Sequence, residues 1–215
     1  MEVGSLHDVF RPFVDGFVRT GNLEEDMRRF LERHGRSETA EHCRRVALEA
    51  EALALRWGHD PVLAKAAGYL HDISDVIPNH GRIEAARRLG LEVLPEEEAF
   101  PMIVHQKLSK VMAREIFGVE EEAVLSAIEC HTTLKANAAP LDLMLFVADK
   151  VSWDQPGTPP YLNEVKKGLD ISLRHAAFAY LHYLWERRDT LKVVHPWLIE
   201  AYHDLVKGGA AHDLA

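Results

Sequence analysis

Apolar residues recur along this chain at intervals of three and four positions, the spacing that places them on one face of an α-helix. Within residues 37–57, one such stripe contains His42, Val46, Ala50, Leu53 and Trp57. Strand-like alternation is weak throughout, so the pattern predicts an all-α fold. The expected helices cover residues 5–19, 23–34, 37–57, 61–72, 82–89, 102–117, 120–130, 140–149, 161–188 and 196–207.

Several of these boundaries follow from residues that start or stop helices. Ser37 is a residue type that caps helix N-termini, and Asp60-Pro61 combines a cap with proline at the first helical position. Gly58 is expected to end the helix before it. The acidic segment 91–101, which two prolines interrupt, predicts a loop with a short turn that acts as a mobile flap, and residues 152–160 predict a second loop.

The length of 215 residues suits one domain, and the sequence contains no repeat, low-complexity segment or linker. We therefore expect a single catalytic domain over residues 37–207. Residues 1–36 are expected to form a helical extension packed on it, and residues 208–215 a flexible tail.

Composition narrows the class of protein. The chain is 47% hydrophobic and 27% charged, which is typical of a globular domain, and its formal net charge of -9 argues against a nucleic-acid partner. No apolar run reaches the length of a membrane span, so no membrane partner is expected. The two cysteines cannot form a disulfide framework, which favours a cytoplasmic location. Thirteen histidines are many for this length and point to ligands.

Six His and Asp side chains lie at helix ends or on apolar faces, where a buried charge or unpaired imidazole is costly. They are His42, His71, Asp72, His105, His131 and Asp149. Five predicted helices supply these six side chains. Their inward placement is best explained if the side chains converge on a cation site. Six ligands exceed the needs of one tetrahedral ion and fit two ions about 3.5–4 Å apart. Imidazole and carboxylate together suit a borderline metal such as iron, manganese or zinc.

Two divalent ions would activate a hydroxide near neutral pH and orient a phosphoryl group for in-line attack. The same ligands also fit di-iron oxygen chemistry. Near the site, Asp75 is a candidate acid for the leaving group; it could equally hold a ligand histidine, or be a solvated acid.

An anionic substrate needs hydrogen-bond donors, and several cations and polar residues follow the candidate ligands in sequence. The substrate-binding candidates are Arg45, Lys107, Thr132, Lys135, Asn137 and Lys150. The alternatives are a surface salt bridge for Arg45, solvated lysines, and turn-capping roles for Thr132 and Asn137.

The order and spacing of these residues resemble the HD superfamily of metal-dependent phosphohydrolases. The similarity is closest to the bacterial symmetrical bis(5'-nucleosyl)-tetraphosphatases of the YqeK type. It extends from about Ser37 to Leu205 and rests on segments 41–46, 68–72, 129–137 and 145–149, together with the closing His195-Pro196. The resemblance implies a helical fold with a di-iron-type centre, cleavage of diadenosine tetraphosphate to two ADP, and a homodimer.

The resemblance also implies how the ligands are shared. One ion would take His42, His71, Asp72 and Asp149, and the other would take Asp72 as a bridge with His105 and His131. The chain departs from the family pattern at Ser74-Asp75, at Gln106 and at 150–155, all expected on the substrate side. The alternative functions are a nucleoside mono- or diphosphate phosphatase and a nucleotide-binding sensor with little turnover.

Overall fold

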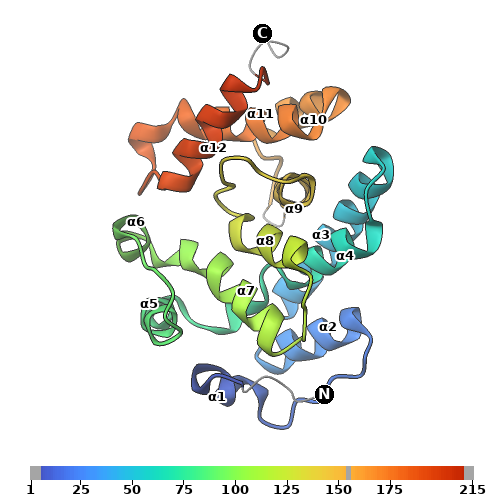
Figure 1. Cartoon of the computed structure of the whole chain (residues 1–215), viewed down its shortest axis with the longest axis vertical. Coiled ribbons are helices and arrows are strands. Elements are labelled where there is room, and N and C mark those ends of the chain that lie inside the picture. Colours follow the sequence, from blue (N-terminus) through green and yellow to red (C-terminus); the bar gives the residue numbers. More distant parts are fainter. Residues whose placement is uncertain (1–5, 154–155, 211–215) are drawn as a thin grey trace.

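The computed structural model of the protein describes residues 6–153 and 156–210. As predicted, the fold is all-α, and the described residues contain no strand (Figure 1). The α-helices are α1 (Arg11–Val14), α2 (Leu23–Arg33), α3 (Ser37–Trp57), α4 (Pro61–Leu70), α5 (Asn79–Arg88), α6 (Pro95–Ala99), α7 (His105–Glu115), α8 (Glu122–Cys130), α9 (Pro140–Val151), α10 (Leu162–Ile171), α11 (Leu173–Trp185) and α12 (Pro196–Lys207). Short 3₁₀ helices are η1 (Asp8–Phe10), η2 (Ile73–Val76), η3 (Pro101–Val104) and η4 (Arg188–Thr190). Among these elements, no helix is long and apolar enough to cross a membrane.

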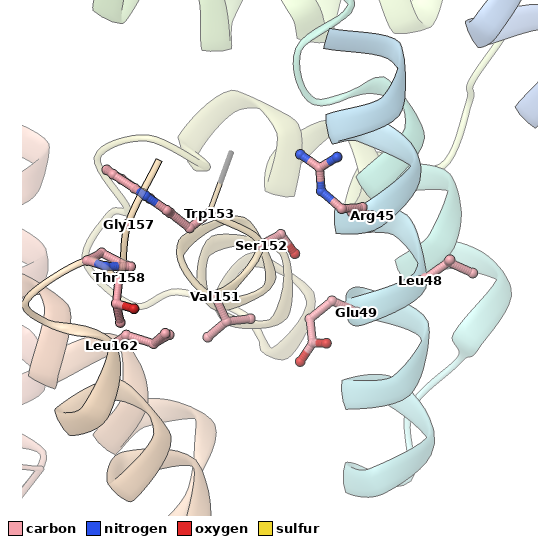
Figure 2. Close-up of a pocket in the computed structure, with 10 residues that line it drawn as sticks. Arg45, Leu48, Glu49, Val151, Ser152, Trp153, Gly157, Thr158 and Leu162 are labelled. Carbon is pink, nitrogen blue, oxygen red and sulfur yellow. The ribbon is translucent and has the colours of Figure 1, made fainter. Parts of the chain in front are cut away.

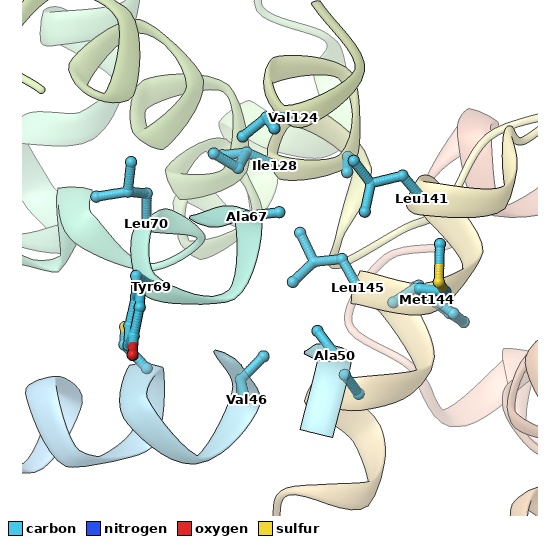
Figure 3. Close-up of a cluster of buried hydrophobic side chains, with 14 of the residues drawn as sticks. Val46, Ala50, Ala67, Tyr69, Leu70, Val124, Ile128, Leu141, Met144 and Leu145 are labelled. Atoms are coloured by element: carbon cyan, nitrogen blue, oxygen red, sulfur yellow. The ribbon is translucent and has the colours of Figure 1, made fainter. Parts of the chain in front are cut away.

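Helices α3, α4, α8 and α9 pack around a shared core. Val46 of α3, Ala67 of α4, Ile128 of α8 and Leu145 of α9 meet there (Figure 3), and each is almost fully buried. Such burial is the main source of stability in a domain of this size. The core also fixes the relative positions of the four helices whose ends carry candidate ligands.

Helices α3 and α4 approach each other unusually closely at Gly68. A Cβ atom added to Gly68 would lie 2.4 Å from the Cα of Ala47, so no larger residue fits without a backbone shift. Gly68 lies three residues before His71, and Ala47 lies on the helix that carries His42. The close crossing therefore brings two histidines from different helices together.

Several predicted boundaries are confirmed. Asp60 caps α4 by accepting hydrogen bonds from the backbone nitrogens of Val62 and Leu63, and Gly58 ends α3 in the left-handed conformation with φ 71°. The expected capping role of Ser37 is wrong. It is the first residue of α3, and the preceding Arg36 provides no side-chain cap.

The first predicted helix is much shorter than expected. Helical structure covers only residues 8–14, and Gly16 with φ 66° ends it. Phe17 then leaves the helical path and packs against Phe30 and Phe117, with ring centroids 5.2 and 6.0 Å apart. The apolar spacing that predicted one helix therefore belongs partly to a loop folded onto α2.

The predicted helix over 161–188 is two helices, because Ser172 adopts an extended backbone with φ -167°. Its hydroxyl accepts a hydrogen bond from the backbone nitrogen of His175 and so caps α11. At Gly168, a Cβ would lie 2.6 Å from the backbone nitrogen of Ala176, so the two helices turn back on each other closely. Both helices continue the same amphipathic pattern, which hides the break from a periodicity argument.

Residues 91–101 contain helix α6 and are not a free loop. Glu97 of α6 is fully buried and is anchored by Lys107 of α7 and by His195, the residue before α12. The expected short turn is helix α6, and the buried contacts of Glu97 argue against a free flap. The domain limits remain predictions, although α2 does pack on α3 and α4. Most of the predicted tail, residues 211–215, lies outside the described residues.

Candidate metal centre

The structure brings all six candidate ligands together. His42 lies in the second turn of α3, His71 and Asp72 follow α4, His105 begins α7, His131 follows α8, and Asp149 lies in the last turn of α9. They form three overlapping groups in which the donor atoms lie within 4.8 Å of one another. The groups are His42, His71 and Asp72; His71, His131 and Asp149; and Asp72, His105 and His131. Convergence of these side chains was expected from the sequence; their assignment as ligands remains a prediction.

Three of the histidines are held by the same local interaction. His71, His105 and His131 each donate from Nδ1 to the backbone carbonyl three residues earlier. The acceptors are Gly68, Met102 and Ile128, at 2.8, 2.6 and 2.8 Å. His71 and His131 directly follow α4 and α8, where terminal carbonyls have no helical partner. With the Nδ1 proton donated to a carbonyl, each neutral ring presents the lone pair of Nε2 to the cluster.

Asp72 lies between two pairs of histidines and turns a different oxygen to each. Its Oδ2 is 3.9 Å from Nε2 of His42 and 3.5 Å from that of His71. Its Oδ1 is 3.1 Å from Nε2 of His105 and 3.3 Å from that of His131. Asp149 Oδ1 joins the first pair, at 3.1 Å from His42 and 3.7 Å from His71. This arrangement is that of a carboxylate shared between two neighbouring cation sites.

The donor set fits cations on electrostatic grounds. Nε2 of His105 and Nε2 of His131 lie 2.9 Å apart, and in neutral rings that donate from Nδ1 both of these atoms carry lone pairs. Asp72 Oδ1 is buried and has no hydrogen-bond partner among the described residues. Electron pairs that face one another at this distance repel unless positive charge lies between them. A bound cation would supply that charge.

Metal binding requires neutral imidazoles and ionised carboxylates, and the surroundings of the candidate ligands favour both. Burial lowers the pKa of His71 to about 4, against the opposing effect of Asp72 and Asp149. Burial acts to raise the pKa of Asp72, but His71 and His105 together hold this pKa well below its usual range. Burial likewise opposes ionisation of Asp149, whose pKa Lys150 holds well below its usual range.

A cavity of about 350 Å³ opens onto the cluster and contains two of the predicted substrate-binding residues. Lys150 Nζ lies 2.6 Å from Asp149 Oδ2 and over the rings of Phe146 and Tyr180. Thr132 Oγ1 lies 3.2 Å from Nε2 of His105. Both side chains are thus placed to meet a ligand that also reaches the histidines.

The same cavity is lined by residues that sequence reasoning did not select. Tyr161, Tyr180 and Met102 contribute to its wall, together with Trp153. The tyrosines belong to a region of ordinary amphipathic pattern, so nothing in the sequence distinguishes them from aromatic residues of the core. Trp153 alone carried a weak signal, as an aromatic residue in a Pro/Gly loop.

Two predicted substrate-binding lysines lie elsewhere. Lys107 is only 5% exposed, and its Nζ pairs with Glu97 at 2.9 Å and lies over the Trp197 ring. Lys135 pairs with Asp142 at 3.2 Å, next to a hydrogen bond to Ser126. These contacts connect helices to each other, so the structure gives both lysines a packing role.

The remaining candidates, Arg45 and Asn137, do not line this cavity. Arg45 lines a second cavity next to the first. Asn137 occupies a turn with φ 54°, a backbone conformation that asparagine tolerates better than most residues.

Asp75 is not free to act as an acid. It accepts hydrogen bonds from Thr39 at 2.8 Å and from Arg82 at 3.1 Å. Arg82 also donates to the carbonyl of Met102, the same carbonyl that accepts from His105 Nδ1. Of the roles expected for Asp75, the geometry favours that of holding a ligand histidine, here His105 by way of Arg82 and the Met102 carbonyl.

Two of the departures from the family pattern, at Ser74-Asp75 and at Gln106, do not line the cavity at the centre, although they were expected on the substrate side. Ser74 is buried and donates to the carbonyl of His105 at 2.8 Å. Gln106 is buried and accepts from the backbone nitrogen of Thr132 at 3.1 Å, while it also donates to Thr133. Both side chains pack behind His105. In the third departure, Lys150 does line the cavity, whereas residues 154–155 lie outside the described part of the chain.

Comparison with known proteins places this geometry in a family. The HD domain family model matches residues 39–154. An uncharacterized protein of Lactococcus lactis subsp. cremoris is 51% identical over 142 residues, which are 66% of this chain and 72% of that protein. A symmetrical bis(5'-nucleosyl)-tetraphosphatase of Halalkalibacterium halodurans is 24% identical over 77% of this chain and 88% of its own.

Solved structures show the same fold. A crystal structure from Clostridium acetobutylicum, described as a predicted HD superfamily hydrolase involved in NAD metabolism, matches with a TM-score of 0.78. The match covers 86% of this chain and 97% of that chain at 24% identity.

Proposed function

The chain belongs to the HD domain family, and on that premise we propose that it cleaves a nucleotide phosphoanhydride with the help of two divalent metal ions. Its similarity to known HD-family hydrolases supports the general class of enzyme, a hydrolase. The substrate we propose is diadenosine tetraphosphate, with two ADP as products, because several relatives carry the name symmetrical bis(5'-nucleosyl)-tetraphosphatase. The observation that carries the proposal is Asp72, whose two oxygens face two separate pairs of histidines.

We propose that the two ions are shared as the resemblance implies. His42, His71 and Asp149 would hold one ion, His105 and His131 the other, and Asp72 would contact both. Iron is the metal we propose, and the nitrogen and oxygen donors also accept manganese or zinc. Such ions, when bound, lower the pKa of a water molecule and neutralise phosphoryl oxygens.

The chain itself supplies the groups that bind and orient the substrate. The Lys150 ammonium lies at the cavity wall and stays charged, because the carboxylate of Asp149 raises its pKa despite burial. A charged donor at this point suits a phosphate oxygen. The Thr132 hydroxyl is a second donor, on the side of His105. Tyr161 and Tyr180 form an aromatic wall, which suits a nucleobase or ribose.

The substitution Asp72→Ala tests the proposal, with Asp170→Ala as its matched control. Asp170 is a solvent-exposed acid on α10, and its side chain is 81% exposed. Asp72→Ala is expected to lose bound metal and hydrolysis together, while the control keeps both. Near wild-type turnover by Asp72→Ala would contradict the proposed function.

Product analysis separates the proposed reaction from its rivals. Two ADP from each diadenosine tetraphosphate fit the proposal, and inorganic phosphate from mono- or diphosphates identifies a phosphatase instead. Tight nucleotide binding without product, in metal-loaded protein, identifies a sensor. A cytoplasmic location is part of the proposal, and Cys43 and Cys130 are buried free thiols that suit it.

A further inference from the structure

We call the cavity that opens onto the six candidate ligands the metal cavity. A second cavity of about 490 Å³ lies beside it, between α3 and residues 151–153 and 157–162. We call it the distal cavity; its lining includes Arg45, Glu49, Ser152, Trp153, Thr158 and Leu162 (Figure 2). Trp153 lines both cavities, so the two share a wall. The metal cavity and the distal cavity are therefore adjacent compartments along one surface.

The distal cavity has a cation at the side nearest the metal centre. Arg45 is three residues after His42 on α3, which is about 4.5 Å further along the helix axis. Arg45 forms an ion pair with exposed Glu41 at 3.8 Å, an interaction that water weakens. Figure 2 shows the Arg45 guanidinium directed across the cavity, toward the segment that carries Trp153. A phosphate chain leaving the metal centre on this side would meet a positive charge.

Beyond Arg45 the lining contains one acid, Glu49, whose pKa burial raises, and otherwise uncharged groups. Trp153 is 36% exposed, and the side chains of Leu48 and Leu162 add apolar surface. Ser152 and Thr158 offer hydroxyl groups. An aromatic face next to apolar surface suits a nucleobase, and hydroxyl groups suit a ribose. The lining thus offers a cation for a phosphate, hydroxyl groups for a ribose and an aromatic ring for a base.

On the basis of the proposed function, we infer that the distal cavity binds the second nucleoside of a dinucleoside polyphosphate. Cleavage at the centre of such a substrate leaves two equal arms, each a nucleoside with two phosphates. One arm would occupy the metal cavity beside Tyr161 and Tyr180. The other would pass Arg45 and end in the distal cavity, with Trp153 between the two nucleosides. Substrates with one nucleoside would leave the distal cavity unused.

The test compares two substrates that differ only in the second nucleoside, diadenosine tetraphosphate and adenosine 5'-tetraphosphate. The variant Thr158→Trp fills the distal cavity from its exposed rim and leaves the metal cavity intact. The control is Thr190→Trp, at an exposed threonine in η4. For Thr158→Trp, kcat/KM on the dinucleotide is expected to fall at least about tenfold, the contribution of one stacked base. Its kcat/KM on adenosine 5'-tetraphosphate is expected to stay unchanged.

Equilibrium binding of ADP gives a second readout that does not depend on turnover. Metal-loaded wild-type protein is expected to bind two ADP per chain, and Thr158→Trp one. One ADP per wild-type chain, or equal kcat/KM on both substrates in wild type and variant, would overturn the inference. Failure of wild-type protein to hydrolyse either substrate would instead contradict the proposed function, and the ADP stoichiometry would still decide the role of the distal cavity.

Discussion

Substitution of Lys107 tests whether this lysine binds substrate or stabilises the fold. Sequence position places it two residues after the candidate ligand His105, whereas the structure pairs its ammonium with the fully buried carboxylate of Glu97. The informative substitution is Lys107→Met, which keeps the length of the side chain and removes its charge. If the structural role holds, this change alters stability and leaves substrate affinity intact.

The size of the effect follows from what Glu97 would retain. Removing one partner of a buried ion pair costs about 3–5 kcal/mol, because the other charge stays buried. Glu97 would still accept hydrogen bonds from the backbone nitrogen of Leu94 at 2.8 Å and from His195 at 3.3 Å. We therefore take the lower end, about 3 kcal/mol, which lowers Tm by about 6–12 °C in a chain of this length.

The change in Tm is measured by thermal unfolding, monitored by circular dichroism. Every sample carries the same metal load, because bound ions also raise Tm. Lys167→Met is the control, since its pair with Glu164 is exposed and is expected to shift Tm by no more than about 2 °C. Steady-state kinetics at 25 °C should give an unchanged KM for Lys107→Met. An unchanged Tm together with a raised KM would refute the structural role and would indicate that Lys107 binds substrate.

Three further predictions concern the supports of the site. Burial opposes ionisation of Glu97, but hydrogen bonds from His195 and Leu94 hold its pKa below 4.5, the value of an unperturbed glutamate. The ionised carboxylate therefore stabilises the folded state fully above about pH 4.5, and this stabilisation is lost as the pH falls through the lower pKa of the folded state. Acid unfolding of Glu97→Gln should therefore depend less on pH below about 4.5 than that of wild type, and equal slopes would contradict this. Gly68→Ala, which forces α4 away from α3, should cost about 1–3 kcal/mol in urea unfolding and weaken metal binding; unchanged metal affinity would show that the close crossing is not needed. Arg82→Gln removes the donor to the carbonyl that holds His105, so calorimetric metal affinity should fall about 10–100-fold while the fold persists, and an unaltered affinity would exclude this role.

The convergence of the six candidate ligands was predictable because each is a polar residue at a position where the pattern favours an apolar one. A histidine or aspartate on an apolar helix face is costly unless something compensates for it, and His42 and Asp149 both stand out in this way. Helix periodicity then sets the directions of the side chains. The hydrogen bonds from Nδ1 to carbonyls three residues earlier were not foreseen, since they depend on helix ends that the pattern locates only approximately.

The roles of the lysines were not predictable, because the partner of a charge is set by tertiary contacts. Lys107 and Glu97 are ten residues apart in sequence, and His195, which completes their cluster, is 98 residues from Glu97. Gln106 was likewise expected near a substrate and instead ties α7 to the turn after α8. The break at Ser172 was missed for a related reason: the apolar pattern continues through it.

The central claim is that Asp72 joins two metal ions whose presence is required for hydrolysis. The direct measurement is a titration of chelator-treated protein with ferrous iron without oxygen, or with manganese, in which bound ions and hydrolysis of diadenosine tetraphosphate are followed together. We predict no turnover without metal and a plateau of activity at two ions per chain, with ADP as the product. Full turnover in metal-free protein, or a plateau at one ion per chain, would contradict the account.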